Sequence, residues 1–279
     1  MLGREWGRMA ETETGPELTQ AEREEAEQRS SVTVHVVHEA VRREGEQELQ
    51  RSSSALAWSG LAAGLSMGFS LIAEGLLRSK LPDEPWRPLV TKFGYSAGFL
   101  LVILGRQQLF TENTLTPMLQ LFGSRDRAML RNVARLWGVV FVTNLVGAAV
   151  IAWVLGATGA FPPDVRQAFM QLGREAIAPG FGLILLRGVF AGWLIAMLVW
   201  MLPFAETARF FVVLGMTWLI GLGGFSHVVA GAIEVMTLAV GGGGSWEAAL
   251  LGYILPALIG NILGGVALVA VINHAQVVS

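Results

Sequence analysis

Six long apolar segments fill the chain from residue 53 onward, and this pattern constrains the fold more than any other feature. A helix needs about 20 mostly apolar residues to cross a bilayer. The segments run over residues 53–77, 88–123, 132–157, 178–202, 207–240 and 247–272. Charged residues make up only 15% of the chain and the mean hydropathy is +0.52. The sequence therefore predicts an all-α membrane protein with six transmembrane helices.

The second and fifth segments are too long for a single crossing, and each is interrupted. In the second, the string GRQQLFTENT contains Arg106, Gln107, Gln108 and Glu112. In the fifth, the string GLGGFSH ends at His227. Irregular backbone at membrane depth is tolerated where it is buried in protein or lines a cavity. We therefore expect both helices to be broken inside the membrane.

Matching strings relate the two halves of the chain. The glycine pair Gly60 and Gly64 in the first segment is repeated by Gly188 and Gly192 in the fourth, and NLVGA in the third resembles NILGG in the sixth. Three segments per half place the halves in opposite orientations. The sequence thus predicts two inverted three-helix repeats with a solute path near the midplane. The spaced glycines themselves predict close helix packing.

Residues 1–51 have a different composition, because 12 of the 22 acidic residues precede Ser52 and no apolar run there reaches membrane length. Valines at helical spacing predict a short amphipathic helix within residues 31–50. We expect residues 1–51 to form an acidic cytosolic arm and residues 52–279 to form the transmembrane channel domain. Lys and Arg are twice as frequent in the segments assigned to the cytosol, which predicts cytosolic termini.

Ionisable residues within the spans are candidates for function. For Arg187 and Glu234 the sequence leaves two alternatives open, a structural ion pair or an influence on the pore potential. Glu74 lies near a helix end, where we expect it to reach the interface. His227 follows a glycine-rich break, which favours a pore-lining role over a structural one. The chain has no cysteine, nucleophile motif, metal cluster or nucleotide loop, so we expect no enzyme activity, cofactor, metal or nucleic-acid partner.

The chain resembles the formate/nitrite transporter family from about Ser53 to Val271. The resemblance is carried by LFTENTLTPML, FVTNLVGA, RGVFAGWLIAMLVWM, GFSHVVAG and ILPALIGNILGG, and GLSMGFSLIAEG, ARLWGVV and NHAQV are similar to its YfdC-like subgroup. It implies an aquaporin-like helix arrangement and a homopentamer in the bacterial cytoplasmic (inner) membrane, with one pore in each protomer. It places the central histidine at His227, its loop threonine at Thr111, and two apolar constrictions at Tyr95, Phe99, Leu109, Phe110 and Ile220.

Four positions depart from the polar residues typical of this family. Glycine stands at Gly192 and Gly231 in place of asparagines, and Ser226 and Gln108 stand in place of acidic residues. These departures remove polar contacts around the pore. They leave the substrate open among formate, nitrite, hydrosulfide, lactate and other small anions.

An apolar pore with one titratable group predicts transport of small monovalent weak-acid anions as the neutral acid. Moving a bare carboxylate into a dry constriction costs of order 20 kcal/mol in the ideal case and several after relaxation. Protonating an acid of pKa about 4 at neutral pH costs roughly 4 kcal/mol. His227 is one source of the proton, and water is the other. A pH-insensitive channel for neutral solutes and a non-transporting scaffold are the alternatives.

Overall fold

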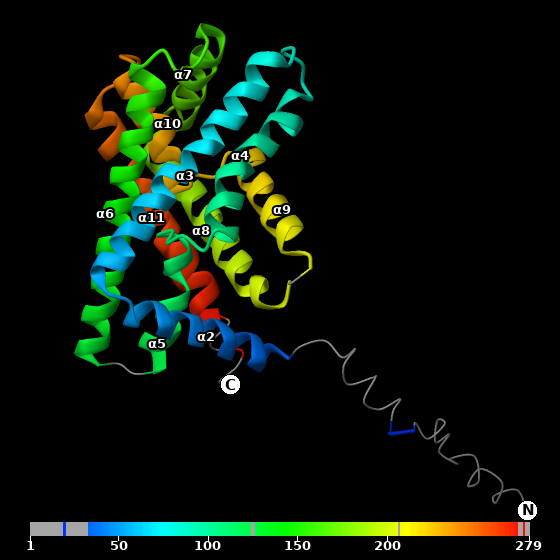
Figure 1. Ribbon diagram of the computed structural model, residues 1–279, viewed down its shortest axis with the longest axis vertical. Helices are drawn as coiled ribbons and strands as arrows, with labels where there is room; N and C mark the ends of the chain where they lie inside the picture. The colour runs from blue at the N-terminus through cyan, green and yellow to red at the C-terminus, as the bar shows by residue number, and fades with distance from the viewer. Residues whose placement is uncertain (1–18, 21–32, 124–125, 206, 273–275, 277–279) are drawn as a thin grey trace, which may run out of the picture. The chain divides into compact units, whose positions relative to one another are not determined.

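The computed structural model describes residues 19–20, 33–123, 126–205, 207–272 and 276, and among these every regular element is a helix (Figure 1). The chain divides into two compact units, Met1–Thr33 and Val34–Ser279, and the second contains all the labelled helices of Figure 1. Most of the expected arm lies outside the described residues. Its C-terminal part contains helix α2 (Val34–Gln50).

Five helical spans are long and apolar enough to cross a membrane. They are α3 (Ser53–Lys80), α4 (Arg87–Leu104), α6 (Arg127–Ala157), α8 (Phe181–Met201) with the turn that follows it, and Ala248–Ala267, which contains α11 (Leu255–Ile262). In place of a long fifth span the structure has two shorter apolar helices, α9 (Arg209–Leu222) and α10 (Val228–Val240). The all-helical membrane architecture predicted from the sequence is thus present.

Helices α4 and α9 end in the same way. In each, one residue adopts a left-handed conformation, Arg106 at φ 50° and Gly224 at φ 60°. The next residue then donates its N–H back to a carbonyl five positions earlier, Gln107 to Val102 at 2.9 Å and Phe225 to Ile220 at 3.0 Å. This is the Schellman ending of a helix, which satisfies carbonyls that the helix leaves without partners. After α4 a 3₁₀ turn (Glu112–Thr114) and α5 (Thr116–Gly123) follow, and after α9 the chain enters α10.

Glycines bring the long helices close together. A Cβ added at Gly64 of α3 would lie 2.3 Å from the carbonyl oxygen of Asn144 in α6. A Cβ added at Gly264, just after α11, would lie 2.1 Å from the carbonyl oxygen of Val189 in α8. Without an aqueous driving force, helices in lipid associate through such close backbone packing. The packing role predicted for these glycines is confirmed.

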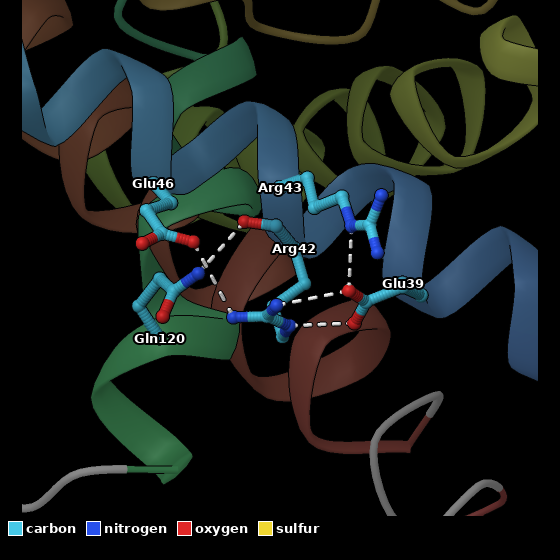
Figure 2. Close-up of polar contacts among 5 residues, drawn as sticks. All are labelled: Glu39, Arg42, Arg43, Glu46 and Gln120. Carbon is cyan, nitrogen blue, oxygen red and sulfur yellow. Dashed lines mark hydrogen bonds and ion pairs between the residues drawn. The ribbon is translucent and has the colours of Figure 1, made fainter.

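Helix α2 lies against α5 at one end of the helical unit, and α7 (Pro163–Ile177) lies at the other end (Figure 1). Figure 2 shows the contact of α2 with α5, in which Gln120 donates to the carbonyl of Arg42 at 2.8 Å. Arg42 and Arg43 bind the carboxylate of Glu39 at 2.7 Å each. These hydrogen bonds, that of Arg42 first, lower the pKa of Glu39 to about 2. Four charged residues of α2, namely Glu39, Arg42, Arg43 and Glu46, are thus paired within the helix.

Candidate functional site

The two interrupted segments meet in a hydrogen bond between Thr111 and His227. Thr111 immediately precedes the 3₁₀ turn after α4, and His227 is the N-cap residue of α10. The Thr111 hydroxyl lies 2.7 Å from Nε2 of His227, and both residues are completely buried. Residues 116 positions apart in the sequence are therefore joined at the centre of the helical unit.

The surroundings of His227 define which ring nitrogen carries the proton. Nδ1 accepts the backbone N–H of Ala230 at 3.2 Å, as the cap of α10. A nitrogen that accepts a hydrogen bond has a free lone pair, so the neutral ring carries its proton on Nε2. Nε2 then donates to the Thr111 hydroxyl, and the hydroxyl proton is free to donate in turn. His227 is thus arranged as a hydrogen-bond donor.

Aromatic side chains pack beside this hydrogen bond. The ring of Phe99 contacts the His227 ring edge-on at 4.9 Å, and Tyr95 packs on Phe99 at 5.3 Å. The rings of Phe110 and Phe141 lie 5.0 Å apart, so Phe110 is turned toward α6. The five residues to which the resemblance assigned constrictions are all buried, namely Tyr95, Phe99, Leu109, Phe110 and Ile220. The structure brings Tyr95 and Phe99 together with His227, whereas the ring contacts of Phe110 are with α6.

Asn144 of α6 fixes the backbone of the first interruption. Its Oδ1 accepts the N–H of Phe110 at 2.9 Å, and its Nδ2 donates to the carbonyls of Gln108 at 2.9 Å and Gly60 at 2.8 Å. Asn144 is completely buried. Because a buried polar group without a partner is costly, these bonds hold the loop that presents Thr111 in one conformation.

Asn261 of α11 fixes the second interruption with the same three types of bond. Its Oδ1 accepts the N–H of Val228 at 2.8 Å, and its Nδ2 donates to the carbonyls of Ser226 at 2.8 Å and Gly188 at 2.9 Å. Ser226 and Val228 flank His227 in the sequence. Asn261 therefore holds the backbone on both sides of the histidine.

A cavity of about 860 Å³ lies on the α2 side of the Thr111–His227 contact, and we call it the α2 chamber. Its lining includes residues of α2, Gln107 and Gln108 of the first interruption, and Glu112. The Glu48 carboxylate accepts from Gln108 at 3.1 Å and from Thr116 at 2.7 Å, which connects α2 to the interruption. Burial raises the pKa of Glu48 to about 7, against the opposing effect of these two hydrogen bonds.

A cavity of about 350 Å³ lies on the α7 side, and we call it the α7 chamber. Tyr95, Ile220, Ser226 and Tyr253 contribute to its lining, together with several charged residues. Neither chamber is lined by Thr111 or His227. Glu112, which follows Thr111, lines the α2 chamber, and Ser226, which precedes His227, lines the α7 chamber. The Thr111–His227 contact and the Phe99 ring beside it therefore lie between residues that line the two chambers.

The comparisons with known proteins agree with this arrangement. The family model "Formate/nitrite transporter" matches residues 35–275. The chain belongs to the formate/nitrite transporter family. It is 40% identical over 241 residues to "Inner membrane protein YfdC" of Escherichia coli (strain K12), a match that covers 86% of this chain and 78% of the relative. It is 25% identical to "Nitrite transporter NirC" of the same organism, over 76% of this chain and 78% of the relative.

Two solved structures share the fold. An "FNT family ion channel" superposes with a TM-score of 0.74 at 21% identity, covering 86% of this chain and 98% of that chain. A "Pentameric formate channel with formate bound" superposes with a TM-score of 0.65 at 18% identity, covering 85% of this chain and 99% of that chain. The helices described above therefore have the arrangement of formate/nitrite channels.

The structure gives physical reasons for the departures from the family pattern. A Cβ at Gly192 would lie 2.3 Å from the carbonyl oxygen of Asn261, so no side chain fits between these helices. A Cβ at Gly231 would lie 1.9 Å from the hydroxyl oxygen of Tyr253, which occupies the space of a larger residue. Gln108 lies beside Glu48, where an acidic residue would place two carboxylates in contact. Three of the four departures, at Gly192, Gly231 and Gln108, are thus each matched by a neighbouring residue.

Several residues of the chambers were not predicted from the sequence, among them Glu48, Lys92 and Tyr253. Glu74, which we expected at the interface, is only 1% exposed and forms an ion pair with Lys92. That prediction was wrong, because α4 approaches α3 closely at Gly94, where a Cβ would lie 2.5 Å from the backbone nitrogen of Glu74. The signal in the sequence was Lys92 itself, a charged residue within the apolar helix α4.

Proposed function

We propose that the protein transports small monovalent weak-acid anions, such as formate or nitrite, and that each crosses the centre of the pore as the neutral acid. The observation that supports this proposal is the buried Thr111–His227 hydrogen bond, with the ring of Phe99 beside it, between two chambers. Membership of the formate/nitrite transporter family supports the same substrate class.

The cost of burying charge favours the neutral acid as the form that crosses the pore. Burying a bare carboxylate costs several kcal/mol even after relaxation, whereas protonating a carboxylate of pKa about 4 at neutral pH costs roughly 4 kcal/mol. In the proposed mechanism the anion enters a chamber, takes a proton, and passes the aromatic contact as the acid. His227 donates a hydrogen bond from Nε2, directly or through the Thr111 hydroxyl, and the proton comes from chamber water. This assignment follows from the cap that occupies Nδ1.

We further propose that the chain consists of two inverted three-helix repeats with broken second and fifth helices. The matched Schellman endings at Arg106 and Gly224 support this, as do the matched contacts of Asn144 and Asn261. In this scheme α4 with α5 and α9 with α10 are the broken pairs. Residues 52–279 form the channel domain, and residues 1–51 form an arm that ends in α2.

The proposed assembly is a homopentamer in the bacterial cytoplasmic membrane, with one pore in each protomer and both termini in the cytosol. A relative is described as an inner membrane protein and a solved neighbour as a pentameric formate channel. The outward side of α6 supports burial in lipid or against another protomer, because Val142, Val146, Val150 and Trp153 are each about half exposed at helical spacing. Native mass measurement in mild detergent tests this, and a stable monomer or trimer contradicts it.

The decisive experiment measures uptake of formate, nitrite and hydrosulfide into proteoliposomes at external pH values from 5 to 8. Neutral-acid transport predicts uptake that increases as the external pH falls. At each pH, uptake by the proteoliposomes should be faster than uptake by protein-free liposomes. Equal uptake of a neutral solute such as urea at every pH would indicate a neutral-solute channel instead. Absence of flux for every substrate would indicate a protein that does not transport.

A further inference from the structure

The charged residues of the α7 chamber divide into paired and unpaired groups. Four basic side chains line it, and three of them have a carboxylate partner. The partners are Glu175 for Arg78 at 2.8 Å, Asp83 for Arg87 at 2.5 Å, and Glu74 for Lys92. The fourth, Arg187, forms no ion pair or hydrogen bond with any residue in the described part of the chain.

Arg187 lies beside the second interruption. It belongs to α8, and one of its terminal nitrogens lies 3.8 Å from the position that a Cβ would take at Gly224. Gly224 is the left-handed residue at the end of α9, three positions before His227. A guanidinium stays charged in proteins, and a charged residue in a membrane-spanning helix is by default a candidate for function. The unpaired guanidinium therefore lies where a solute approaches the central contact.

Net charge alone does not predict anion binding in this chamber. By formal charge, the four basic residues are matched in number by the three carboxylate partners and by Glu234 of α10, which lines the same chamber without an ion pair among the described residues. A balanced set of charges does not concentrate anions in general. Recognition then depends on the geometry of the one guanidinium whose donors are free.

We infer that Arg187 is the anion-binding residue of the α7 chamber and that its ligand is a planar anion with two oxygens on one atom, such as a carboxylate or nitrite. A guanidinium presents two parallel N–H groups, and a two-oxygen anion accepts each on its own oxygen in a nearly straight hydrogen bond, whereas a spherical anion takes both on one atom in bent, weaker contacts. This inference rests on the proposed transport function, because it names the group that holds the substrate before it takes its proton. It also predicts selection by shape as well as by charge.

The test measures equilibrium binding of radiolabelled formate to the purified full-length protein in detergent, with sodium nitrite and sodium chloride as competitors. Arg187→Gln should weaken formate binding by about tenfold or more, the amount typical of a charge-assisted paired contact. Arg187→Lys keeps the charge and loses the fork, so the preference for formate over chloride should fall. Arg87→Lys is the matched control, since Arg87 lines the same chamber with a carboxylate partner, and it should leave that preference unchanged.

Three results would overturn the proposed site. The wild-type protein binds no formate, the Arg187→Gln variant binds formate as tightly as the wild type, or the Arg187→Lys variant keeps the wild-type preference for formate over chloride. Thermal unfolding of each variant shows whether it is folded. If the Arg187→Gln variant is not folded, the formate preference of the Arg187→Lys variant decides the test. Formate binding that depends on Arg187 without flux into liposomes supports the site and contradicts the transport function. If formate enters liposomes but neither Arg187 variant changes formate binding, the proposed site is wrong and the transport function stands.

Discussion

Asn144 and Asn261 make the same three types of hydrogen bond, one residue beside each of the two interrupted segments. Each accepts one backbone N–H and donates to two backbone carbonyls, at 2.8 to 2.9 Å. In each case one carbonyl belongs to a neighbouring helix and the other groups belong to an interruption. A single buried amide thus connects a broken segment to two helices, once on the side of Thr111 and once on the side of His227.

The first prediction concerns these amides. Asn144→Ala and Asn261→Ala should each lower the midpoint of thermal unfolding in detergent, because each leaves buried backbone groups without partners at about 1–3 kcal/mol per group. Asn144→Asp and Asn261→Asp keep the acceptor but place a carboxyl oxygen against the two carbonyls. At neutral pH they should therefore be destabilised at least as much as the alanine variants. Alanine variants that unfold at the wild-type temperature would show that other contacts hold the interruptions.

The second prediction concerns the aromatic contact beside His227. Phe99→Ala combined with Ile220→Ala should raise formate flux and increase uptake of lactate relative to formate, because two buried side chains near the central contact are removed. The measurement is initial uptake into proteoliposomes. Phe169→Ala is a control for lost packing alone, since Phe169 is fully buried in α7 and lines neither chamber. Wild-type size selection in a folded double variant would exclude these side chains as the gate.

The third prediction separates the two roles of His227. His227→Asn keeps an amide donor and loses the titrating ring, whereas His227→Phe loses both. If His227 acts as a donor, His227→Asn should keep substantial formate uptake with the wild-type dependence on pH between about 5 and 8, a range that brackets the ordinary imidazole pKa. His227→Phe should lose most uptake. A flat pH profile for His227→Asn would instead show that the ring supplies the proton.

The lengths of the apolar segments were sufficient to predict the five long spans but not α7, which falls between two segments. The polar and glycine-rich strings predicted where α4 and α9 end. The packing role of Gly64 and Gly264 also followed from spacing, because small residues four apart have few other uses in a membrane helix. The internal repeat placed Thr111 and His227 at nearly matching positions, but a hydrogen bond between them was proposed only through the family resemblance. Their separation in the sequence gives no local signal that they touch.

Contacts between distant helices could not be predicted from local patterns. Lys92 pairs with Glu74 because Gly94 lets α4 approach α3. A lysine within an apolar helix signals that a partner is needed, but it does not identify Glu74 as that partner. The sequence left open whether Arg187 and Glu234 form an ion pair. Both line the α7 chamber, and no ion pair joins them in the described part of the chain. Glu48 was missed for another reason. Its partners are Gln108 in the interruption and Thr116 at the start of α5, and the sequence does not define the path that brings them to α2.

The fourth prediction follows from the buried carboxyl of Glu48. Burial raises its pKa from 4.5 to about 7, so the folded state binds the proton more tightly than the unfolded state does. The free energy that holds α2 in place should therefore decrease as the pH rises from about 4.5 to about 7 and stay constant above that. Glu48→Gln should remove this dependence and stabilise the docked helix at pH 8.

Hydrogen exchange over residues 34–50, with labelling times corrected for the intrinsic effect of pH, measures this directly. Wild-type α2 should be less protected at pH 8 than at pH 5.5, and Glu48→Gln should be equally protected at both. Glu46→Gln is the control, because Glu46 is an exposed carboxyl of the same helix. The proposed role of Glu48 is wrong if the two variants respond to pH in the same way.

The fifth prediction concerns the pairing of Gly231 with Tyr253. Gly231→Asn restores the residue typical of the family, yet its Cβ would lie 1.9 Å from the tyrosine hydroxyl oxygen and 2.2 Å from the adjoining ring carbon. The single variant should therefore be strongly destabilised, because the tyrosine ring is 97% buried and has little room to move. Tyr253→Ala alone should also be destabilised, since it leaves a cavity in place of the ring.

The combination of Gly231→Asn with Tyr253→Ala removes the clash and fills part of the cavity, so the double variant should unfold at a higher temperature than the sum of the single effects predicts. Residues in direct contact commonly show coupling of about 0.5–3 kcal/mol, which a double-mutant cycle of unfolding free energies detects. Gly215→Asn with Tyr253→Ala is the control pair, because nothing lies within 4 Å of a Cβ at Gly215. Additive effects at Gly231 and Tyr253 would show that the two positions changed independently, and the tyrosine would then not be the reason that asparagine is absent.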